Sequence, residues 1–173
     1  EPDDIAAYVS LTAPVDFRHA GRLGTMVDER WFDASAVASA GNVAPRQMQS
    51  GFVTLDPVGQ ISKWVMLADR AHNDGFVESF RVLETWVNDN IPFPADAYET
   101  YISDLYQDND LVEGRHYVGG RHADLGEIDC PVLTIAADHD NICPPDAASP
   151  LNELAGSEET EWFTVPGGHV GAV

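Results

Sequence analysis

The sequence predicts an α/β fold in which a parallel sheet is interrupted by a long helical insertion. Two observations carry this prediction: short runs of β-forming residues towards both ends of the chain, and helical periodicity between them. The first run, residues 6–12, is expected to be a buried parallel strand. The two later runs are residues 131–137 and 161–165. Residues 146–156 are typical of a crossover helix, with Asp146 or Ser149 as its cap and Gly156 as its end. A strand, a crossover helix and a further strand form the βαβ unit of a parallel sheet.

The middle of the chain has helical periodicity. In residues 74–87 the apolar side chains recur with the spacing of one helical face, and further helices are expected over residues 33–40, 45–54, 57–70 and 95–106. Gly119-Gly120 is a two-residue turn suited to a β-hairpin between residues 115–118 and 121–124. About a hundred residues of mostly helix between two strands of one sheet form a cap. We therefore expect residues 1–173 to be part of one domain, with a helical cap insertion at residues 22–125.

The chain is strongly acidic, with 29 Asp and Glu against 9 Lys and Arg and a net charge of −20. This balance makes nucleic acid a poor partner. The carboxylates are spread along the chain, which favours the solvated surface of a salt-adapted cytoplasmic protein; the alternative is an ordinary acidic bacterial protein. No apolar stretch reaches the length of a membrane span, and the acidic N-terminus does not resemble a signal peptide.

The cysteines and the hairpin histidines predict neither a disulfide nor a metal site. Cys130 and Cys143 flank the strand expected at residues 131–137 and would lie about 20 Å apart, so both are interpreted as free thiols. His116 and His122 would face opposite sides of the hairpin, which does not bring two ligands to one ion.

Acidic residues follow one predicted strand, and a histidine follows the next. Asp138 and Asp140 come directly after residues 131–137, and His169 comes after residues 161–165. The carboxyl ends of parallel strands are where open α/β sheets build their sites. The order of acid, helix, strand and histidine is that of α/β hydrolases, in which a carboxylate orients the imidazole of a triad. Spacing alone does not choose between the two acids, and each residue taken alone is also typical of a turn cap or a solvated loop.

The nucleophile of such a triad is missing from the 173 residues. No Gly-x-Ser-x-Gly or Gly-x-Cys-x-Gly elbow occurs in the sequence. Cys143 follows the acid and precedes Pro144-Pro145, so no strand–turn–helix holds it, and we interpret it as structural. His139 is a competing histidine beside the acids. The sequence therefore predicts a partial α/β-hydrolase fold of parallel strands plus a helical cap, which lacks the N-terminal half with the nucleophile elbow.

Several segments resemble the C-terminal half of polyhydroxyalkanoate synthase, specifically the class III catalytic subunit. They span nearly the whole chain: residues 12–17, 78–86, 118–121, 124–125, 130–133 and 166–171. In that family the catalytic acid begins an Asp-His-(Leu/Ile)-Val-Pro run after its strand. Residues 140–144 match this run, so the resemblance favours Asp140 over Asp138 and places the catalytic histidine at His169. Asn141 departs from the family, which usually has histidine there. The acidic composition suggests a haloarchaeal version.

The resemblance implies an acyltransferase. In that family a cysteine thiolate takes the acyl group from a 3-hydroxyacyl-coenzyme A, and repeated transfer to the hydroxyl of a growing chain builds a storage polyester. His169 would generate the thiolate, and Asp140 would orient His169 or help activate the 3-hydroxyl. The resemblance further implies a second synthase subunit of the PhaE type, a place at the surface of polyester granules, and no metal or redox cofactor.

Two other functions stay open on the sequence. The first is another acyltransferase or an esterase of the same fold, because the positions of acid and base are shared across it. The second is a non-catalytic module that lines a granule or binds a partner. If the chain is a synthase fragment, we expect it to be inactive alone, because the nucleophile lies outside it.

Overall fold

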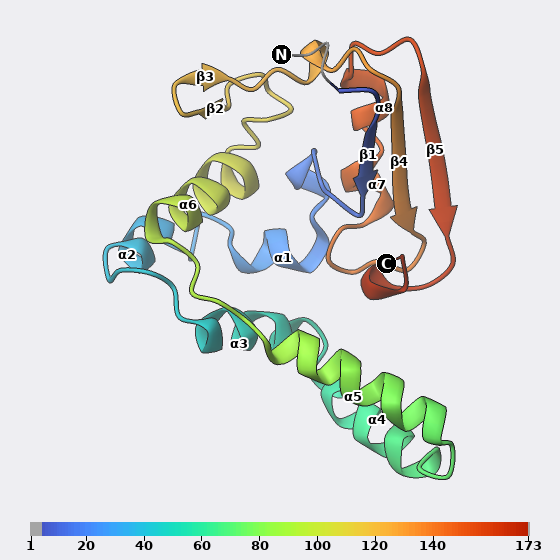
Figure 1. The fold of residues 1–173 in the computed structure, drawn as a ribbon. Coiled ribbons are helices and arrows are strands. Elements are labelled where there is room, and N and C mark those ends of the chain that lie inside the picture. Colours follow the sequence, from blue (N-terminus) through green and yellow to red (C-terminus); the bar gives the residue numbers. More distant parts are fainter. Residues whose placement is uncertain (1–4, 173) are drawn as a thin grey trace. The chain divides into compact units, whose positions relative to one another are not determined.

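A computed structural model describes residues 5–172 and divides into two compact units (Figure 1). One unit comprises the described residues up to Ser35 together with those from Glu99 onwards, and it contains the sheets. The other unit, Ala36–Tyr98, is helical apart from an isolated bridge between Val43 and Phe93. No helix among the described residues has the length and apolar character needed to cross a membrane.

The main sheet of the first unit has three parallel strands in the order β1-β4-β5. These strands are β1 (Tyr8–Leu11), β4 (Val132–Ala137) and β5 (Thr160–Val165). All three predicted strands are confirmed. The expected burial of the first is wrong, because β1 pairs only with β4 and Val9 is 56% exposed. The central strand β4 is the most buried of the three, and its residues Val132, Ala136 and Ala137 have almost no accessible surface.

The crossover from β4 to β5 consists of two short helices, α7 (Pro145–Ala148) and α8 (Leu151–Leu154). A single helix was expected over residues 146–156, and that prediction is wrong because Pro150 lies between the two helices. A proline has no N–H to continue the ladder, and its ring clashes with the preceding turn. The predicted caps are also wrong: α7 starts after Pro144 without a side-chain cap, and Ser149 is its C-terminal cap. Leu151 packs with Val15 and Val132 in the core behind the sheet.

Four of the five helices predicted in the middle of the chain lie within one or two residues of their predicted bounds, whereas the one predicted over residues 95–106 ends as an α-helix at Thr100. The five helices are α2 (Ala34–Ala38), α3 (Pro45–Leu55), α4 (Pro57–Asp69), α5 (Asp74–Asn88) and α6 (Ala95–Thr100). After α6 the chain continues as a π-helix, η3 (Tyr101–Gln107), which the periodicity did not predict. Helix α1 (Gly21–Met26) and the 3-10 turns η2 (Phe17–His19), η4 (Leu125–Glu127) and η5 (His169–Ala172) were not predicted either.

The predicted hairpin is confirmed as β2 (Tyr117–Val118) and β3 (Arg121–His122). Gly119 and Gly120 have φ values of 57° and 80°, and a turn with two positive φ values matches the twist of antiparallel strands. His122 lies opposite Tyr117 in the register, as the two-residue turn requires.

Candidate active site

The candidate site lies where β4 and β5 end, at the same edge of the sheet. The last pair of the parallel register is Ala137 with Val165, so the two following loops start side by side. They are then joined by backbone hydrogen bonds from Asp138 N to Val165 O, 3.0 Å, and from His139 N to Gly167 O, 2.9 Å. The acid loop after β4 and the histidine loop after β5 are therefore held together before any side chain is considered.

Asp140 and His169 form a direct hydrogen bond across these loops. The distance between His169 Nδ1 and Asp140 Oδ2 is 2.8 Å, with the carboxylate side chain fully buried and the imidazole 31% exposed. The other carboxylate oxygen, Oδ1, accepts the backbone N–H groups of Ile142 and Cys143, each at 2.8 Å. An ionised carboxylate only accepts hydrogen bonds, so Nδ1 carries the proton and Nε2 is the basic nitrogen. This is the arrangement in which an acid orients a general base.

Asp138, the competing acid, does not contact His169. Its Oδ1 accepts the backbone N–H of Gly167 at 2.8 Å, which stabilises the turn that leads to the histidine. His139 is 84% exposed and its Nε2 lies 3.9 Å from Asp138 Oδ1. The structure thus brings Asp140, the acid favoured by the resemblance, to His169 and leaves Asp138 and His139 outside the pair.

Cys143 is buried directly behind the acid and is a poor candidate for a nucleophile. It has no accessible surface and packs with Ala136, Ala147 and Ala148. Burial, with a smaller contribution from the charge of Asp140, raises the pKa of the Cys143 thiol to about 12. The thiolate is the reactive form of cysteine, so this thiol is inert near neutral pH. Cys130 is a free thiol as well.

The remaining sequence candidates do not form a site. His116 Nδ1 lies 3.9 Å from Asp104 Oδ2, and His122 Nε2 lies 2.8 Å from the carbonyl oxygen of Gly114. Among residues 5–172, no group of three or more His, Cys, Asp or Glu side chains could hold a metal ion.

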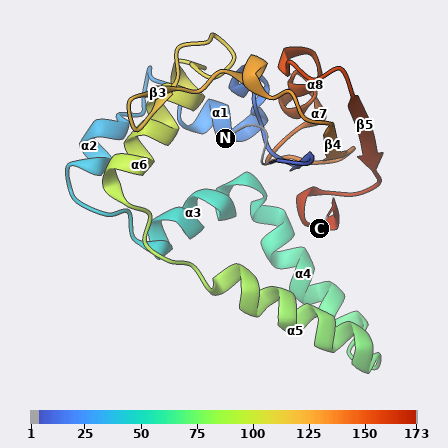
Figure 2. The ribbon, with the colours of Figure 1, turned by 45° about the horizontal axis from the view of Figure 1, so that its top comes forward.

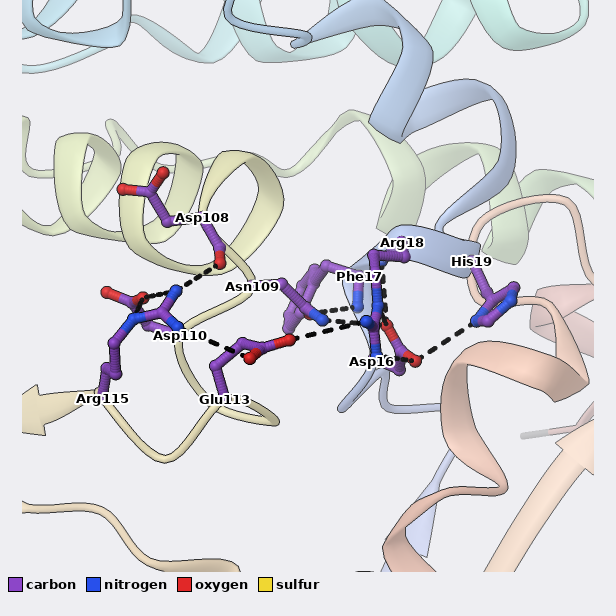
Figure 3. Close-up of polar contacts among 9 residues, drawn as sticks. All are labelled: Asp16, Phe17, Arg18, His19, Asp108, Asn109, Asp110, Glu113 and Arg115. Carbon is purple, nitrogen blue, oxygen red and sulfur yellow. Dashed lines mark hydrogen bonds and ion pairs between the residues drawn. The ribbon is translucent and has the colours of Figure 1, made fainter.

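A buried polar network that the sequence did not indicate supports the acid loop from the side of β1 (Figure 3). Asp16 accepts hydrogen bonds from the Arg18 backbone and guanidinium, each at 3.1 Å, and from Asn109 Nδ2 at 3.0 Å. Asn109 Oδ1 in turn accepts the N–H of Phe17 at 2.8 Å. The backbone N–H groups of residues 15 and 16 donate to the carbonyl oxygen of Ala147. The network therefore holds α7, the helix that follows the acid loop.

The charge of Asp16 is stabilised by this network. Burial works to raise the pKa of Asp16, but the hydrogen bonds and charge of Arg18 and the amide of Asn109 outweigh it and hold the pKa below its ordinary value. Asn109 has a φ of 55°, a left-handed conformation that asparagine tolerates better than most residues. Asparagine at a turn was the only available sequence signal for this position.

These observations define the class of the protein, which is an α/β protein with an acid–histidine pair at the carboxyl edge of a parallel sheet. No family model matches the chain. Curated proteins do: the chain is 34% identical over 145 residues to the PhaC subunit of poly(3-hydroxyalkanoate) polymerase from Haloarcula marismortui, and 35% identical over 146 residues to that from Haloferax mediterranei. It is 32% identical over 173 residues to the same subunit from Allochromatium vinosum.

The chain is therefore a homologue of PhaC subunits of poly(3-hydroxyalkanoate) polymerase, which confirms the resemblance found in the sequence. The alignments cover 83% of this chain for each of the two haloarchaeal relatives and 98% for the third. They cover only 30%, 30% and 48% of those relatives. The chain thus spans less than half the length of the curated relatives it matches.

Proposed function

We propose that this chain is the acid–base part of a poly(3-hydroxyalkanoate) synthase, which polymerises 3-hydroxyacyl groups and releases coenzyme A. The observation that carries the proposal is the 2.8 Å hydrogen bond between Asp140 and His169 in a homologue of PhaC subunits. We infer that the nucleophile is a cysteine of a Gly-x-Cys-x-Gly elbow in the intact protein, about 10–20 residues before residue 1, because one crossover helix has to fit between elbow and strand.

In the first half-reaction, Nε2 of His169 takes the proton of the cysteine thiol. The cysteine thiolate attacks the thioester carbonyl carbon, the bond to the coenzyme A sulfur breaks, and the leaving coenzyme A thiolate takes from Nε2 the proton that the cysteine lost. The product is an acyl group on the cysteine and free coenzyme A. Asp140 keeps the proton on Nδ1 and stabilises the imidazolium while it exists.

In the second half-reaction, Nε2 takes the proton of a 3-hydroxyl group, and the alkoxide oxygen attacks the acyl-cysteine. The new ester bond forms as the carbon–sulfur bond breaks, and the cysteine recovers its proton from the imidazolium. One base therefore serves both steps, and each turnover lengthens the polyester by one unit. The chain alone is inactive in this proposal, because the attacking sulfur is supplied by the rest of the protein.

The wider setting of the enzyme belongs to the same proposal. Residues 22–125 act as a helical cap of one catalytic domain of the α/β-hydrolase type, and a second synthase subunit of the PhaE type works with it at the surface of polyester granules in the cytoplasm. The net charge of −20 and the two haloarchaeal relatives support adaptation to high salt, which screens repulsion between carboxylates.

The test compares His169→Ala with His139→Ala in the intact protein. Coenzyme A release from 3-hydroxybutyryl-coenzyme A measures turnover, and mass spectrometry of the quenched protein detects the acyl-cysteine. We expect His169→Ala to lose both signals, whereas His139→Ala, which changes an exposed histidine at the same edge, keeps both. Full turnover by His169→Ala would exclude it as the base. Release of a free 3-hydroxy acid instead of polymer would indicate an esterase.

A further inference from the structure

Helices α4 and α5 form an antiparallel hairpin in the unit Ala36–Tyr98 (Figures 1 and 2). An ion pair between Lys63 Nζ and Glu84 Oε1, 2.7 Å, and the edge-to-face contact of Trp64 with Phe80, 5.4 Å between ring centres, join the two helices. Neither helix has a single buried residue. Apolar helices are ordinarily buried, so the exposure of this hairpin needs an explanation.

The five most exposed apolar residues of the two helices form two stripes. The α4 stripe consists of Val58, Ile61 and Val65, with exposures of 70%, 71% and 57%. The α5 stripe consists of Val82 and Trp86, with exposures of 60% and 62%, and both line a shallow groove on that helix. Contiguous apolar surface of this kind marks an interaction site on a folded protein.

The two stripes face away from each other. At about 100° per residue, Ile61 and Val65 are each about 160° from Lys63, whose side chain reaches α5. Val82 and Trp86 are likewise each about 160° from Glu84, whose side chain reaches α4. The stripes therefore lie on the two outer sides of the hairpin. A folded partner that presents one face covers one of them, whereas an apolar phase in which the hairpin is immersed covers both.

The charge pattern points to the same kind of occupant. Asp56 is the only acidic residue from position 36 to 68, although the chain averages about one acidic residue in six. The unit Ala36–Tyr98 contributes only −3 to the net charge of −20. The acidic surface that solvates the remainder of the chain is thus interrupted along α4, whereas α5 still carries Asp74, Glu78 and Glu84.

The basic residues do not suit an anionic membrane. The unit contains four of them, Arg46, Lys63, Arg70 and Arg81, and no basic cluster. Lys63 is paired with Glu84, and the Arg70 guanidinium stacks over the ring of Phe76 at 5.1 Å. Helices that bind anionic lipid carry rows of Lys and Arg on the polar face. Binding to an uncharged aliphatic surface requires no Lys or Arg.

We propose that the α4–α5 hairpin docks on the polyester itself, with the α4 and α5 stripes immersed in the apolar surface of the polymer. This inference rests on the proposed function, because it takes the occupant to be the product of the synthase. Docking keeps the enzyme beside the chain it extends, and it relies on apolar contact, which high salt strengthens rather than screens.

The test measures binding of the intact protein to amorphous poly(3-hydroxybutyrate) particles by co-sedimentation in high salt. The variants are Ile61→Ser with Val65→Ser for the α4 stripe, and Val82→Ser with Trp86→Ser for the α5 stripe. We expect each pair to lower the partition coefficient at least about tenfold, because each removes two large apolar side chains from the contact. The matched control is Val118→Ser in β2, at a position 61% exposed, which leaves binding unchanged.

Three results would overturn the inference. Equal retention of the stripe variants and Val118→Ser would mean that the stripes are not the contact. Dissociation of a wild-type oligomer by the stripe variants, with polymer binding unchanged, would identify an interface between protein chains. Stronger binding to phosphatidylcholine vesicles than to the polyester would identify a lipid surface. The single variants Ile61→Gln and Val82→Gln, checked by circular dichroism, give the same answer if a double variant does not fold.

The proposed function is tested separately from the docking. Coenzyme A release by the wild type without particles tests the synthase activity alone. We expect His169→Ala to lose that release and still bind the particles, because the stripes do not include the base. Particle binding without coenzyme A release in the wild type would contradict the synthase and leave the apolar docking surface in place.

Discussion

The pair of Asp140 and His169 makes one substitution especially informative, Asp140→Asn in the intact protein. The asparagine oxygen keeps the two hydrogen bonds from the N–H groups of Ile142 and Cys143. Its NH2 group then replaces Oδ2 and faces His169 Nδ1, so two donors oppose each other. The imidazole relieves this by moving its proton to Nε2, which is the wrong tautomer for a base.

The size of the effect follows from the hydrogen bond that is lost. A hydrogen bond to a charged group contributes about 1.5–3 kcal/mol, so loss of the carboxylate's stabilisation of the imidazolium alone slows each proton transfer about 10- to 100-fold. The wrong tautomer adds to this, and in a serine protease the equivalent change costs on the order of 10⁴. The first acyl transfer should suffer less than chain growth, because a cysteine thiol with a pKa of about 8.5 is already partly ionised at neutral pH.

The assay follows acyl-cysteine formation in a single turnover and coenzyme A release over many turnovers. The control is Asp138→Asn, in which the remaining oxygen still accepts the N–H of Gly167 and no contact with His169 is changed. We expect the control to stay within about twofold of wild type. Equal losses in the two variants would refute the assignment of Asp140 as the orienting acid.

Three further predictions concern stability and reactivity. Gly156→Ala places a methyl group against the Gly126 backbone and should destabilise the fold by about 2 kcal/mol or more in urea unfolding, whereas Gly51→Ala, in an open helical position, should not. Cys143 should react with iodoacetamide far more slowly than Cys130 at pH 8, and equal rates by mass spectrometry would contradict its burial. The pKa of Asp16 is lower in the folded than in the unfolded protein, so its stabilisation is present above about pH 4 and is lost as the pH falls through the folded pKa. The urea-unfolding free energies of wild type and Asp16→Asn should therefore differ at pH 6, and the difference should shrink as the pH falls below about 4.

Local sequence signals predicted the elements that depend on local chemistry. The strands β4 and β5 are dense in β-forming residues, and α5 has a strong apolar face with Asn73 capping its first turn. The glycine pair of the hairpin required positive φ values and has them. Such elements are specified by residues adjacent in the chain, so a single sequence suffices to predict them.

Features that depend on distant residues were not predictable in this way. Spacing did not distinguish Asp138 from Asp140, because the distinction arises from a turn in which Oδ1 of Asp140 binds two backbone N–H groups and so directs Oδ2 at His169. The buried contact of Asn109 with Asp16 joins residues 93 positions apart. The break at Pro150 is different, because a proline within the expected helix is a local signal for its interruption.

Packing and hydrogen bonding are coupled in the acid loop. This coupling explains why a cysteine that is not a nucleophile is buried beside Asp140. The Cys143 N–H donates to Asp140 Oδ1, while its side chain fills a pocket between Ala136, Ala147 and Ala148. A larger residue at position 143 would push the loop away from the small side chains of α7. The hydrogen bond to Oδ1 would then lengthen, and Oδ2 would leave His169. The thiol therefore acts through its size, and the hydrogen bond between Asp140 and His169 depends on a side chain that takes no part in it.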